Sequence, residues 1–335
     1  MPEYTGPALV DLQVNGFAGV DFNDAATTAE QVQDALTAME ATGVGLCLPT
    51  IITSSLEHFA ACARVVLSTR HPAIAGLHME GPYISAEDGF RGAHPRAHVR
   101  AASLDDFERR QEAADGTIRL VTLAPEVPGT LSLTEHLASR GIRVAIGHTN
   151  ASTQQLADAV SAGATLSTHL GNGCPVTLAR HPNVIWDQLA DDRLTASLIV
   201  DGHHLPPATV KVMMRAKTTA RCLLVTDAMM AAGRPPGRYR IGALEVELSP
   251  SGRVAAPGSA TLAGSSLTLD RAVALTVHMA GVPLEEAAAM ASTRPAAFLG
   301  IPTRGAIRIT PADRAEDWRI AVDLPKHQET RPAQP

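Results

Sequence analysis

Polar side chains recur at one kind of place in this sequence, directly after short apolar runs. The run at 73–79 leads into Glu80, the run at 143–147 into His148, and the run at 165–168 into His169. Two imidazoles and one carboxylate are a common ligand set for a catalytic divalent ion that keeps one position open for water. A histidine taken alone is more often a hydrogen-bonded structural residue, but the shared setting of these three residues predicts a metal site.

A metal site of this kind needs a separate group that moves protons. A bound divalent ion makes its water acidic near neutral pH and polarises a carbonyl, and a nearby carboxylate must then accept the water's proton. Asp227 follows the apolar run at 222–226 and is predicted to be this base. Its alternative is a helix N-cap. Gln13, within the run at 8–14, and Asn15, directly after it, have two alternative roles, lining the site or structural hydrogen bonding.

The elements that must position these residues are eight strands that alternate with amphipathic helices. Strands alternating with helices indicate a parallel sheet, and eight such units predict an α/β fold of the (β/α)₈ TIM-barrel type, whose catalytic face is the carboxyl ends of the strands. Helices are predicted after the capping-box pairs Thr28/Gln31 and Ser152/Gln155. The predicted strands are Ala8–Val14, Gly45–Ile51, Ala73–Met79, Ile118–Ala124, Arg143–Gly147, Thr165–Thr168, Thr195–Val200 and Cys222–Thr226.

The predicted barrel unit covers residues 1–325. Within it, residues 233–262 are rich in Gly and Pro around short alternating runs, which predicts a β-hairpin insertion after the eighth strand. Two helices are expected after it, at Ser266–Met279 and Pro283–Leu299. The polar, Pro-containing tail at 326–335 is expected to be disordered.

Composition excludes several classes of partner. The net charge is −6 with no basic run, so we expect no nucleic-acid groove, which needs concentrated positive charge. No stretch reaches the roughly 18 apolar residues of a membrane span. No basic segment followed by an apolar core stands at the N-terminus, and the four cysteines form no C-x-x-C pair, so we expect a cytoplasmic protein with free thiols.

Several stretches resemble the amidohydrolase superfamily, and within it the N-acetylglucosamine-6-phosphate deacetylase family. They run in the family's order from about residue 8 to about residue 300 and together are highly specific. The matching stretches are Gly76–Ser85, Leu123–Glu126, Ile146–Ala151, Thr168–Asn172, Val225–Ala228 and Leu262–Thr268.

The resemblance implies the same metal ligands, Glu80, His148 and His169, with Asp227 as general acid/base. Gln13-Val-Asn15 stands where many amidohydrolases have His-x-His for a second metal, so one divalent ion per site is expected, zinc first and iron or manganese as alternatives. The resemblance also implies a homodimer, in which an arginine can reach across the interface. The substrate contacts that it suggests are His94, Asn172, Gly173, Arg180 and His204, with His203 the rival of His204.

The expected reaction is hydrolysis of the N-acetyl group of an amino sugar, first of all N-acetylglucosamine-6-phosphate. Two segments depart from the family pattern, Gly171–Pro175 and Ala179–Asn183, at the phosphate end of the pocket. They leave open an unphosphorylated N-acyl sugar, an N-acyl amino acid or a cyclic amide as substrate. A non-catalytic amino-sugar sensor is the remaining alternative. The family's N-terminal sandwich strands are missing and its closing strand is altered at Ala312–Trp318, so a small β-sandwich is expected to be reduced or absent.

Overall fold

Eight parallel strands form the central sheet of the chain, in a computed structural model that describes residues 1–241, 244–259 and 261–325. Their order is β11-β10-β9-β8-β7-β6-β5-β2, which is the order of the chain, and all eight predicted strands are confirmed. The tail expected at 326–335 lies outside the described residues. The strands are β2 Leu9–Val14, β5 Val44–Ile52, β6 Leu77–Glu80, β7 Ile118–Leu123, β8 Arg143–Ile146, β9 Ala164–Ser167, β10 Thr195–Leu198 and β11 Cys222–Leu224.

The sheet curls into a nearly closed barrel, whose seam lies between the first strand, β2, and the last, β11. No regular ladder joins these two strands, but Val14 forms a parallel bridge with Ala228, and the Asp227 N–H donates to the Gln13 carbonyl at 2.9 Å. The side chain of Asp11 crosses the seam and accepts from the Thr226 hydroxyl at 2.6 Å. The seam is therefore held mostly at its carboxyl end, where the predicted site lies.

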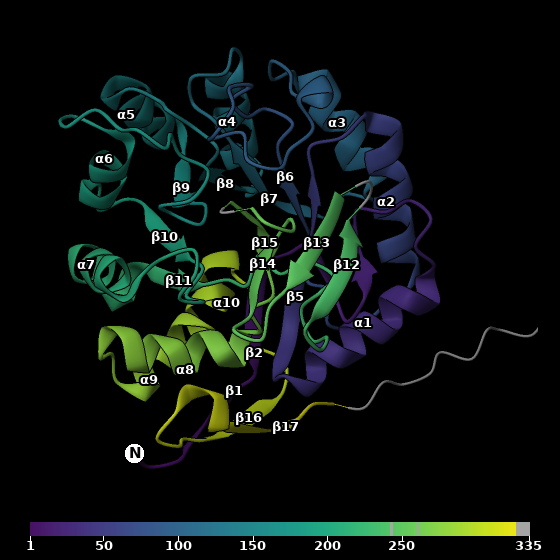
Figure 1. The fold of residues 1–335 in the computed structure, drawn as a ribbon. Helices are drawn as coiled ribbons and strands as arrows, with labels where there is room; N and C mark the ends of the chain where they lie inside the picture. The colour runs from purple at the N-terminus through teal and green to yellow at the C-terminus, as the bar shows by residue number, and fades with distance from the viewer. Residues whose placement is uncertain (242–243, 260, 326–335) are drawn as a thin grey trace, which may run out of the picture.

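Helices surround the barrel (Figure 1), as expected for a (β/α)₈ fold. Both predicted capping boxes are present, Thr28 with Gln31 and Ser152 with Gln155. The helices are α1 Ala29–Ala41, α2 Leu56–Ser68, α3 Leu104–Ala113, α4 Thr130–Ser139, α5 Thr153–Ala162, α6 Val184–Ala190, α7 Pro207–Lys217, α8 Leu269–Ala280, α9 Leu284–Met290 and α10 Thr293–Leu299, with 3₁₀ turns at Arg96–His98, Thr219–Arg221 and Ala315–Asp317.

The helix predicted at Pro283–Leu299 is two helices, α9 and α10. Pro295 lacks the N–H that would donate to the Ala291 carbonyl four residues earlier, so a continuous helix would leave that acceptor unpaired. The Ala291 carbonyl instead accepts from the N–H of Val10 in β2, at 2.8 Å. The break therefore frees a carbonyl whose hydrogen bond joins the C-terminal helices to the first barrel strand, β2.

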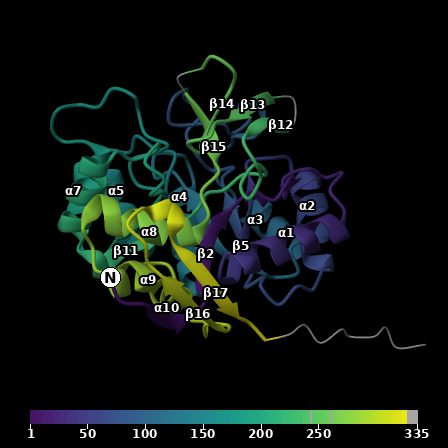
Figure 2. The same ribbon diagram turned by 60° about the horizontal axis from the view of Figure 1, so that its bottom comes forward.

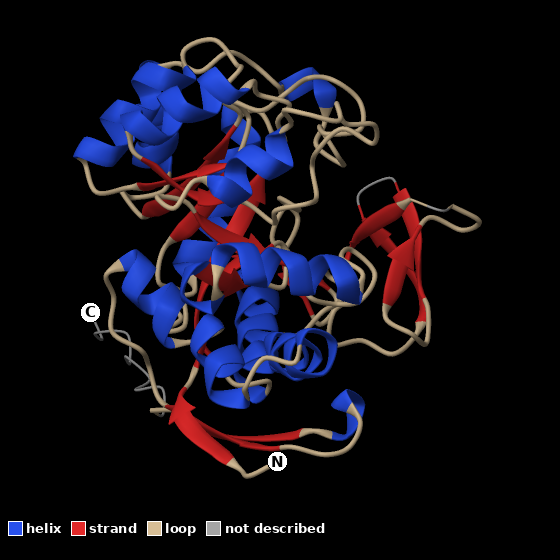
Figure 3. Ribbon diagram, turned by 90° about the vertical axis from the view of Figure 1, so that its left-hand side faces the viewer, coloured by secondary structure: helices blue, strands red, loops and turns tan. Residues whose placement is uncertain are grey.

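The segment where an insertion is expected, 233–262, forms most of a small antiparallel sheet that stands off the barrel (Figure 3). It has its own apolar cluster around Met229, Val246 and Leu248. The Met229 N–H donates to the Ser265 carbonyl at 2.9 Å, which ties the sheet to the end of the eighth barrel strand. The strands are β12 Gly237–Ile241, β13 Leu244–Leu248, β14 Arg253–Ala255 and β15 Leu262–Ser265, in that order.

The described residues also form a small three-stranded antiparallel sheet, and the expected reduction or absence of a β-sandwich stays a prediction. Its strands are β1 Tyr4–Pro7, β16 Ala306–Thr310 and β17 Arg319–Asp323, with β16 in the middle. It lies on the side of the barrel away from β12–β15 (Figure 2). A short β3–β4 pair, Gly16–Phe17 with Val20–Asp21, follows the first barrel strand. None of the described helices combines the length and apolar composition of a membrane span.

Candidate metal centre

Glu80, His148 and His169 meet at the carboxyl end of the barrel. Glu80 is the last residue of β6, and the two histidines each lie two residues beyond the ends of β8 and β9. The Nε2 atoms of His148 and His169 lie 3.2 and 3.1 Å from Glu80 Oε1 and 3.2 Å from each other. All three side chains are buried. Three strands far apart in sequence thus bring the three predicted ligands to one point.

The donor atoms of these residues fit a divalent cation. The Nδ1–H of His148 donates to the Phe90 carbonyl at 2.8 Å, so Nε2 is the ring nitrogen that can bind a cation through its lone pair once it carries no proton. That lone pair faces the Nε2 of His169 and an oxygen of Glu80. A histidine whose outer nitrogen donates to a carbonyl while its inner nitrogen faces a carboxylate has the usual arrangement of a metal ligand. The arrangement can hold a divalent ion.

Negative charge is concentrated in this buried cluster. Burial raises the pKa of the Glu80 carboxyl, but hydrogen bonds from His148 and His169 outweigh it and hold that pKa well below its usual value. The pKa of Asp227 is raised, first by burial and then by the charge of Glu80. Two carboxylates in one buried site repel each other, and a cation between them relieves that repulsion.

The backbone is strained where the cluster is built. His148, His169 and Asp227 have φ values of +51°, +28° and +47°, a region that residues other than glycine enter at a cost of roughly 1–3 kcal/mol each. Each follows a barrel strand, and for His169 the restraint is visible: its N–H donates to the Ser197 hydroxyl of β10 at 2.8 Å. Such strain persists only where neighbours hold it, and it is common at functional sites.

Gln13 and Asn15 contact the carboxylates of this cluster directly. The Gln13 amide nitrogen donates to Glu80 Oε1 at 2.9 Å and to Asp227 Oδ1 at 3.1 Å. The Asn15 amide nitrogen donates to the same Asp227 oxygen at 2.7 Å. Both amides therefore orient Asp227, while their contact with substrate stays a prediction. The side-chain amide oxygen of Asn15, Oδ1, is buried and has no hydrogen-bond partner among the described residues.

His94 joins the cluster from the loop after β6. Its Nδ1 accepts from the backbone N–H of Thr53 at 3.4 Å and lies 2.8 Å from the Thr53 hydroxyl. This pairing leaves the ring proton on Nε2, which lies 3.7 Å from Glu80 Oε2. Burial and the neighbouring His148 lower the pKa of His94 to about 3. His94 is therefore a neutral hydrogen-bond donor beside the three ligands.

The structure separates His204 from its rival, His203. His204 Nδ1 donates to Asp201 Oδ2 at 2.6 Å, and His204 is one of the groups that oppose the rise in the pKa of Asp227. His203 turns away and its Nε2 donates to the Ser251 carbonyl at the β13–β14 turn. Burial raises the pKa of Asp201, but hydrogen bonding to His204 outweighs it and lowers that pKa. Asp201 thus orients His204, a role that the sequence did not reveal.

The remaining predicted residues lie on the loop at 171–183, and they differ in how close they come to the cluster. Asn172 is half-buried and its amide donates to the His169 carbonyl at 3.2 Å. Gly173 lies against both imidazoles, because a Cβ there would be 2.9 Å from His148 Nδ1 and 3.2 Å from His169 Cε1. Arg180 is exposed, and its backbone carbonyl accepts from the Asn183 amide, but no hydrogen bond or ion pair of its guanidinium is seen among the described residues. The chain alone therefore does not bring Arg180 to the cluster.

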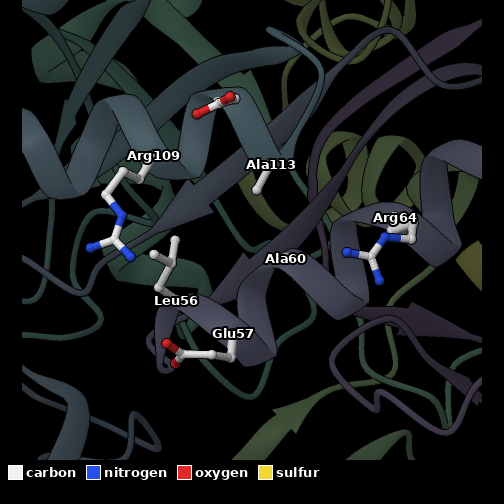
Figure 4. Close-up of a pocket in the computed structure, with 7 residues that line it drawn as sticks. Leu56, Glu57, Ala60, Arg64, Arg109 and Ala113 are labelled. Carbon is white, nitrogen blue, oxygen red and sulfur yellow. The ribbon is translucent and has the colours of Figure 1, made fainter.

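A pocket of about 470 Å³ lies elsewhere, on the outer surface between α2 and α3 (Figure 4). None of the predicted site residues lines it. Its walls are Leu56, Glu57, Ala60, Arg64, Arg109, Glu112 and Ala113.

Comparison with known proteins gives consistent matches. Residues 5–309 match the model of the Amidohydrolase family. An Escherichia coli N-acetylgalactosamine-6-phosphate deacetylase is 37% identical over 301 residues, which are 88% of this chain and 78% of that protein. A human N-acetylglucosamine-6-phosphate deacetylase is 36% identical over 88% of this chain and 74% of its own length. The solved structure of the N-acetylglucosamine-6-phosphate deacetylase of Mycobacterium smegmatis has a TM-score of 0.84 at 30% identity, over 94% of this chain and 87% of its own.

Proposed function

Because the chain belongs to the amidohydrolase family, among the deacetylases of N-acetylated amino-sugar 6-phosphates, we propose that it hydrolyses the N-acetyl group of N-acetylglucosamine-6-phosphate. The products are glucosamine-6-phosphate and acetate. The observation that carries the proposal is the buried donor set of Glu80, His148 and His169 beside Asp227. Relatives named for the galactose epimer make N-acetylgalactosamine-6-phosphate the nearest variant of this substrate.

Glu80, His148 and His169 hold the metal ion in this proposal. When bound, a divalent ion supplies an activated water and polarises the acetyl carbonyl. Zinc is the first candidate, since two histidines and a carboxylate are a common catalytic zinc set, and iron or manganese accept the same ligands. One ion per site is proposed, because Gln13 and Asn15 stand where a second metal would need imidazoles.

Asp227 moves the protons of the reaction. It accepts a proton from the attacking water and returns it to the departing amine nitrogen, so the overall step breaks the C–N bond and forms the acetate C–O bond. Gln13 and Asn15 both donate to Oδ1 of Asp227, which leaves Oδ2 for the proton. Burial and the charge of Glu80 raise the pKa of Asp227, which suits a carboxylate that must both take and return a proton.

The remaining contacts bind the sugar phosphate. His94 donates through Nε2 to an oxygen of the substrate, and His204 contacts the sugar or its phosphate. Asn172 and the backbone of Gly173 meet the phosphate. Arg180 reaches the phosphate of a neighbouring site across a homodimer interface, which explains its exposure in the single chain. We place the enzyme in the cytoplasm.

The altered loop supports one alternative. Gly171–Pro175 and Arg180 shape the phosphate end of the site, and Arg180 is not held near the ligands by this chain. An unphosphorylated N-acetyl sugar, an N-acyl amino acid or a cyclic amide is therefore the second candidate substrate. A non-catalytic sensor has less support, because it needs neither the donor set nor Asp227.

The test is acetate release by zinc-reconstituted protein from N-acetylglucosamine-6-phosphate, its galactose epimer and the unphosphorylated sugar. Turnover of a phosphorylated sugar alone supports the proposal, and an Arg180→Ala variant should then raise KM more than it lowers kcat. Turnover of the unphosphorylated sugar at an equal rate would move the assignment to the alternative. An absence of turnover on all three would overturn the deacetylase proposal and call for a screen of other N-acyl compounds.

A further inference from the structure

We propose that Glu126 is a positioning residue for the metal centre, which holds His148 and the 171–175 loop in place through Thr149. The inference rests on the proposed role of His148 as a metal ligand. Glu126 follows β7 and is half-buried. It does not touch the three ligands, and neither the metal set nor the proton transfer assigns it a role.

Glu126 binds the two residues that follow His148. Its Oε2 accepts a short hydrogen bond from the Thr149 hydroxyl, and its Oε1 accepts from the Asn150 N–H at 2.8 Å. A carboxylate that accepts two bonds from consecutive residues fixes both the position and the direction of the chain there. The chain needs this restraint, because His148 is left-handed with φ +51°, a conformation that persists only where neighbours over-determine it.

Thr149 connects this restraint to the backbone beside the second proposed ligand, His169. It is 3% exposed, its N–H donates to the Gly173 carbonyl at 3.2 Å, and its hydroxyl accepts from the Ala151 N–H at 3.0 Å. The Gly173 backbone lies directly against the imidazoles of His148 and His169. Glu126, Thr149 and Gly173 therefore form one connected support along the outer side of both histidines.

The loop that carries Glu126 is itself well anchored. The Ala124 N–H donates to the Tyr83 carbonyl at 2.9 Å, and the Val127 N–H donates to the Ala124 carbonyl at 3.1 Å. The Thr130 hydroxyl donates to the Val127 carbonyl at 2.7 Å. A carboxylate on a fixed loop can hold its partners in place, whereas one on a loose loop would move with them.

Two variants remove the support in different places. Glu126→Gln keeps the shape of the side chain and one acceptor, but it turns an NH₂ group toward either Thr149 or Asn150. Thr149→Val keeps the shape at Thr149 and removes only its hydroxyl. Thr149→Ser restores that hydroxyl and serves as the conservative rescue. Glu135→Gln, on the exposed side of α4, is the matched control for loss of a carboxylate.

The readout is the zinc dissociation constant of the full chain, measured by competition with a chelator of known affinity. Loss of a group that hydrogen-bonds a metal ligand directly typically weakens metal binding about 10–100-fold. Glu126 and the Thr149 hydroxyl act one residue further away, so we expect the lower end of this range, about tenfold, for Glu126→Gln and Thr149→Val. Thr149→Ser and Glu135→Gln should stay within about threefold of the wild type. Circular dichroism and the Tm of the metal-free proteins show that each variant is folded.

The outcomes distinguish failure of this inference from failure of the proposed metal site. If folded Glu126→Gln and Thr149→Val proteins bind zinc as tightly as the wild type and only their Tm falls, Glu126 merely stabilises its loop and the inference is wrong. If instead Glu80→Gln binds zinc as tightly as the wild type, the metal centre itself is wrongly placed. If Glu126→Gln does not fold, Thr149→Val decides the question.

Discussion

Two polar layers lie one above the other inside the barrel, and both contain histidine. In the lower layer, His78 Nε2 lies 2.8 Å from the Thr122 hydroxyl and Nδ1 lies 3.2 Å from the Thr50 hydroxyl. The Thr122 hydroxyl in turn lies 2.8 Å from that of Thr168. The upper layer holds Glu80, His148, His169 and Asp227. The lower layer is a chain of neutral groups, whereas the upper one gathers carboxylates and imidazole lone pairs at one point.

The histidines of the two layers differ in their hydrogen-bond partners and in their backbone conformation. Both nitrogens of His78 have hydroxyl partners, and burial lowers its pKa to about 4, so it stays neutral. His169 leaves Nδ1 without a hydrogen-bond partner among the described residues and turns Nε2 toward Glu80. His78 lies within β6, while His169 lies beyond its strand in a left-handed conformation. A buried histidine is a candidate ligand when one ring nitrogen faces a carboxylate and a second imidazole nitrogen, as Nε2 of His148 and of His169 does.

The largest effect is expected from Asp227→Asn, which removes the proposed proton-transfer group of the upper layer and none of the proposed ligands. General acid–base catalysis contributes roughly 10²–10⁴-fold, so we expect kcat to fall by about 10³-fold. Zinc stoichiometry should remain that of the wild type. Acetate release and metal analysis on the same preparation test this. A variant with near-normal turnover would remove Asp227 from the mechanism.

Metal removal should distinguish the two layers next. A ligand that binds only the folded state stabilises it by about 2.7 kcal/mol at a hundredfold excess over its dissociation constant. We therefore expect chelation to lower the Tm of the wild type and excess zinc to raise it. Glu80→Gln should show no response to either treatment, because a proposed ligand is missing. If the Tm of the wild type is the same with and without zinc, the proposal of a bound ion at this site is contradicted.

The barrel and the meeting of Glu80, His148 and His169 at one point could be predicted, because both leave local signals in the sequence. Each strand is a short apolar run, and each of the proposed site residues, Glu80, His148, His169 and Asp227, closes or follows such a run. In a parallel barrel those ends meet at one face, so position along the chain implied proximity in space. His78 carries the same local signal two residues before Glu80, but its hydroxyl partners come from other strands, and so its separate role was not predicted.

Other features depend on contacts between distant residues. Glu126 accepts a hydrogen bond from Thr149, which lies 23 residues later in the sequence, and no local pattern at either position predicts that bond. The left-handed backbone at His148 and Asp227 is imposed by surrounding contacts, because neither residue type requires it. The strand Tyr4–Pro7 was also not predicted, since it exists only by pairing with Ala306–Thr310, some 300 residues later. Local patterns do not contain this information.

Thr122→Val should test the lower layer without touching the upper one. The substitution keeps the shape of the side chain but leaves His78 Nε2 and the Thr168 hydroxyl without their shared partner. An unsatisfied buried polar group costs about 1–3 kcal/mol, so we expect the free energy of unfolding of the metal-free protein to fall by about 2 kcal/mol. Urea unfolding measures this loss. Zinc affinity should change little, and a large loss of affinity would show that the two layers act as one unit.

The smallest effect is expected on the free energy of unfolding of the metal-free protein. Asp227→Asn should raise this stability, although the same substitution lowers turnover. Asp227 is buried, its pKa is raised by burial and by Glu80, and its φ is +47°. Asparagine removes the charge repulsion and tolerates the left-handed conformation. It also keeps an oxygen that can accept from Gln13 and Asn15. We expect a gain of about 1 kcal/mol, within the range for relief of strain at a functional site.

Urea unfolding in the presence of chelator measures this gain, with Asp34→Asn, an exposed carboxylate on α1, as the matched control. The control should change stability by less than about 0.5 kcal/mol, as surface substitutions usually do. A variant that is inactive yet more stable than the wild type would show that the upper layer is maintained for chemistry at the expense of stability. A loss of stability would instead make Asp227 a structural member of the seam between β2 and β11, like Asp11, which bonds Thr226 across it.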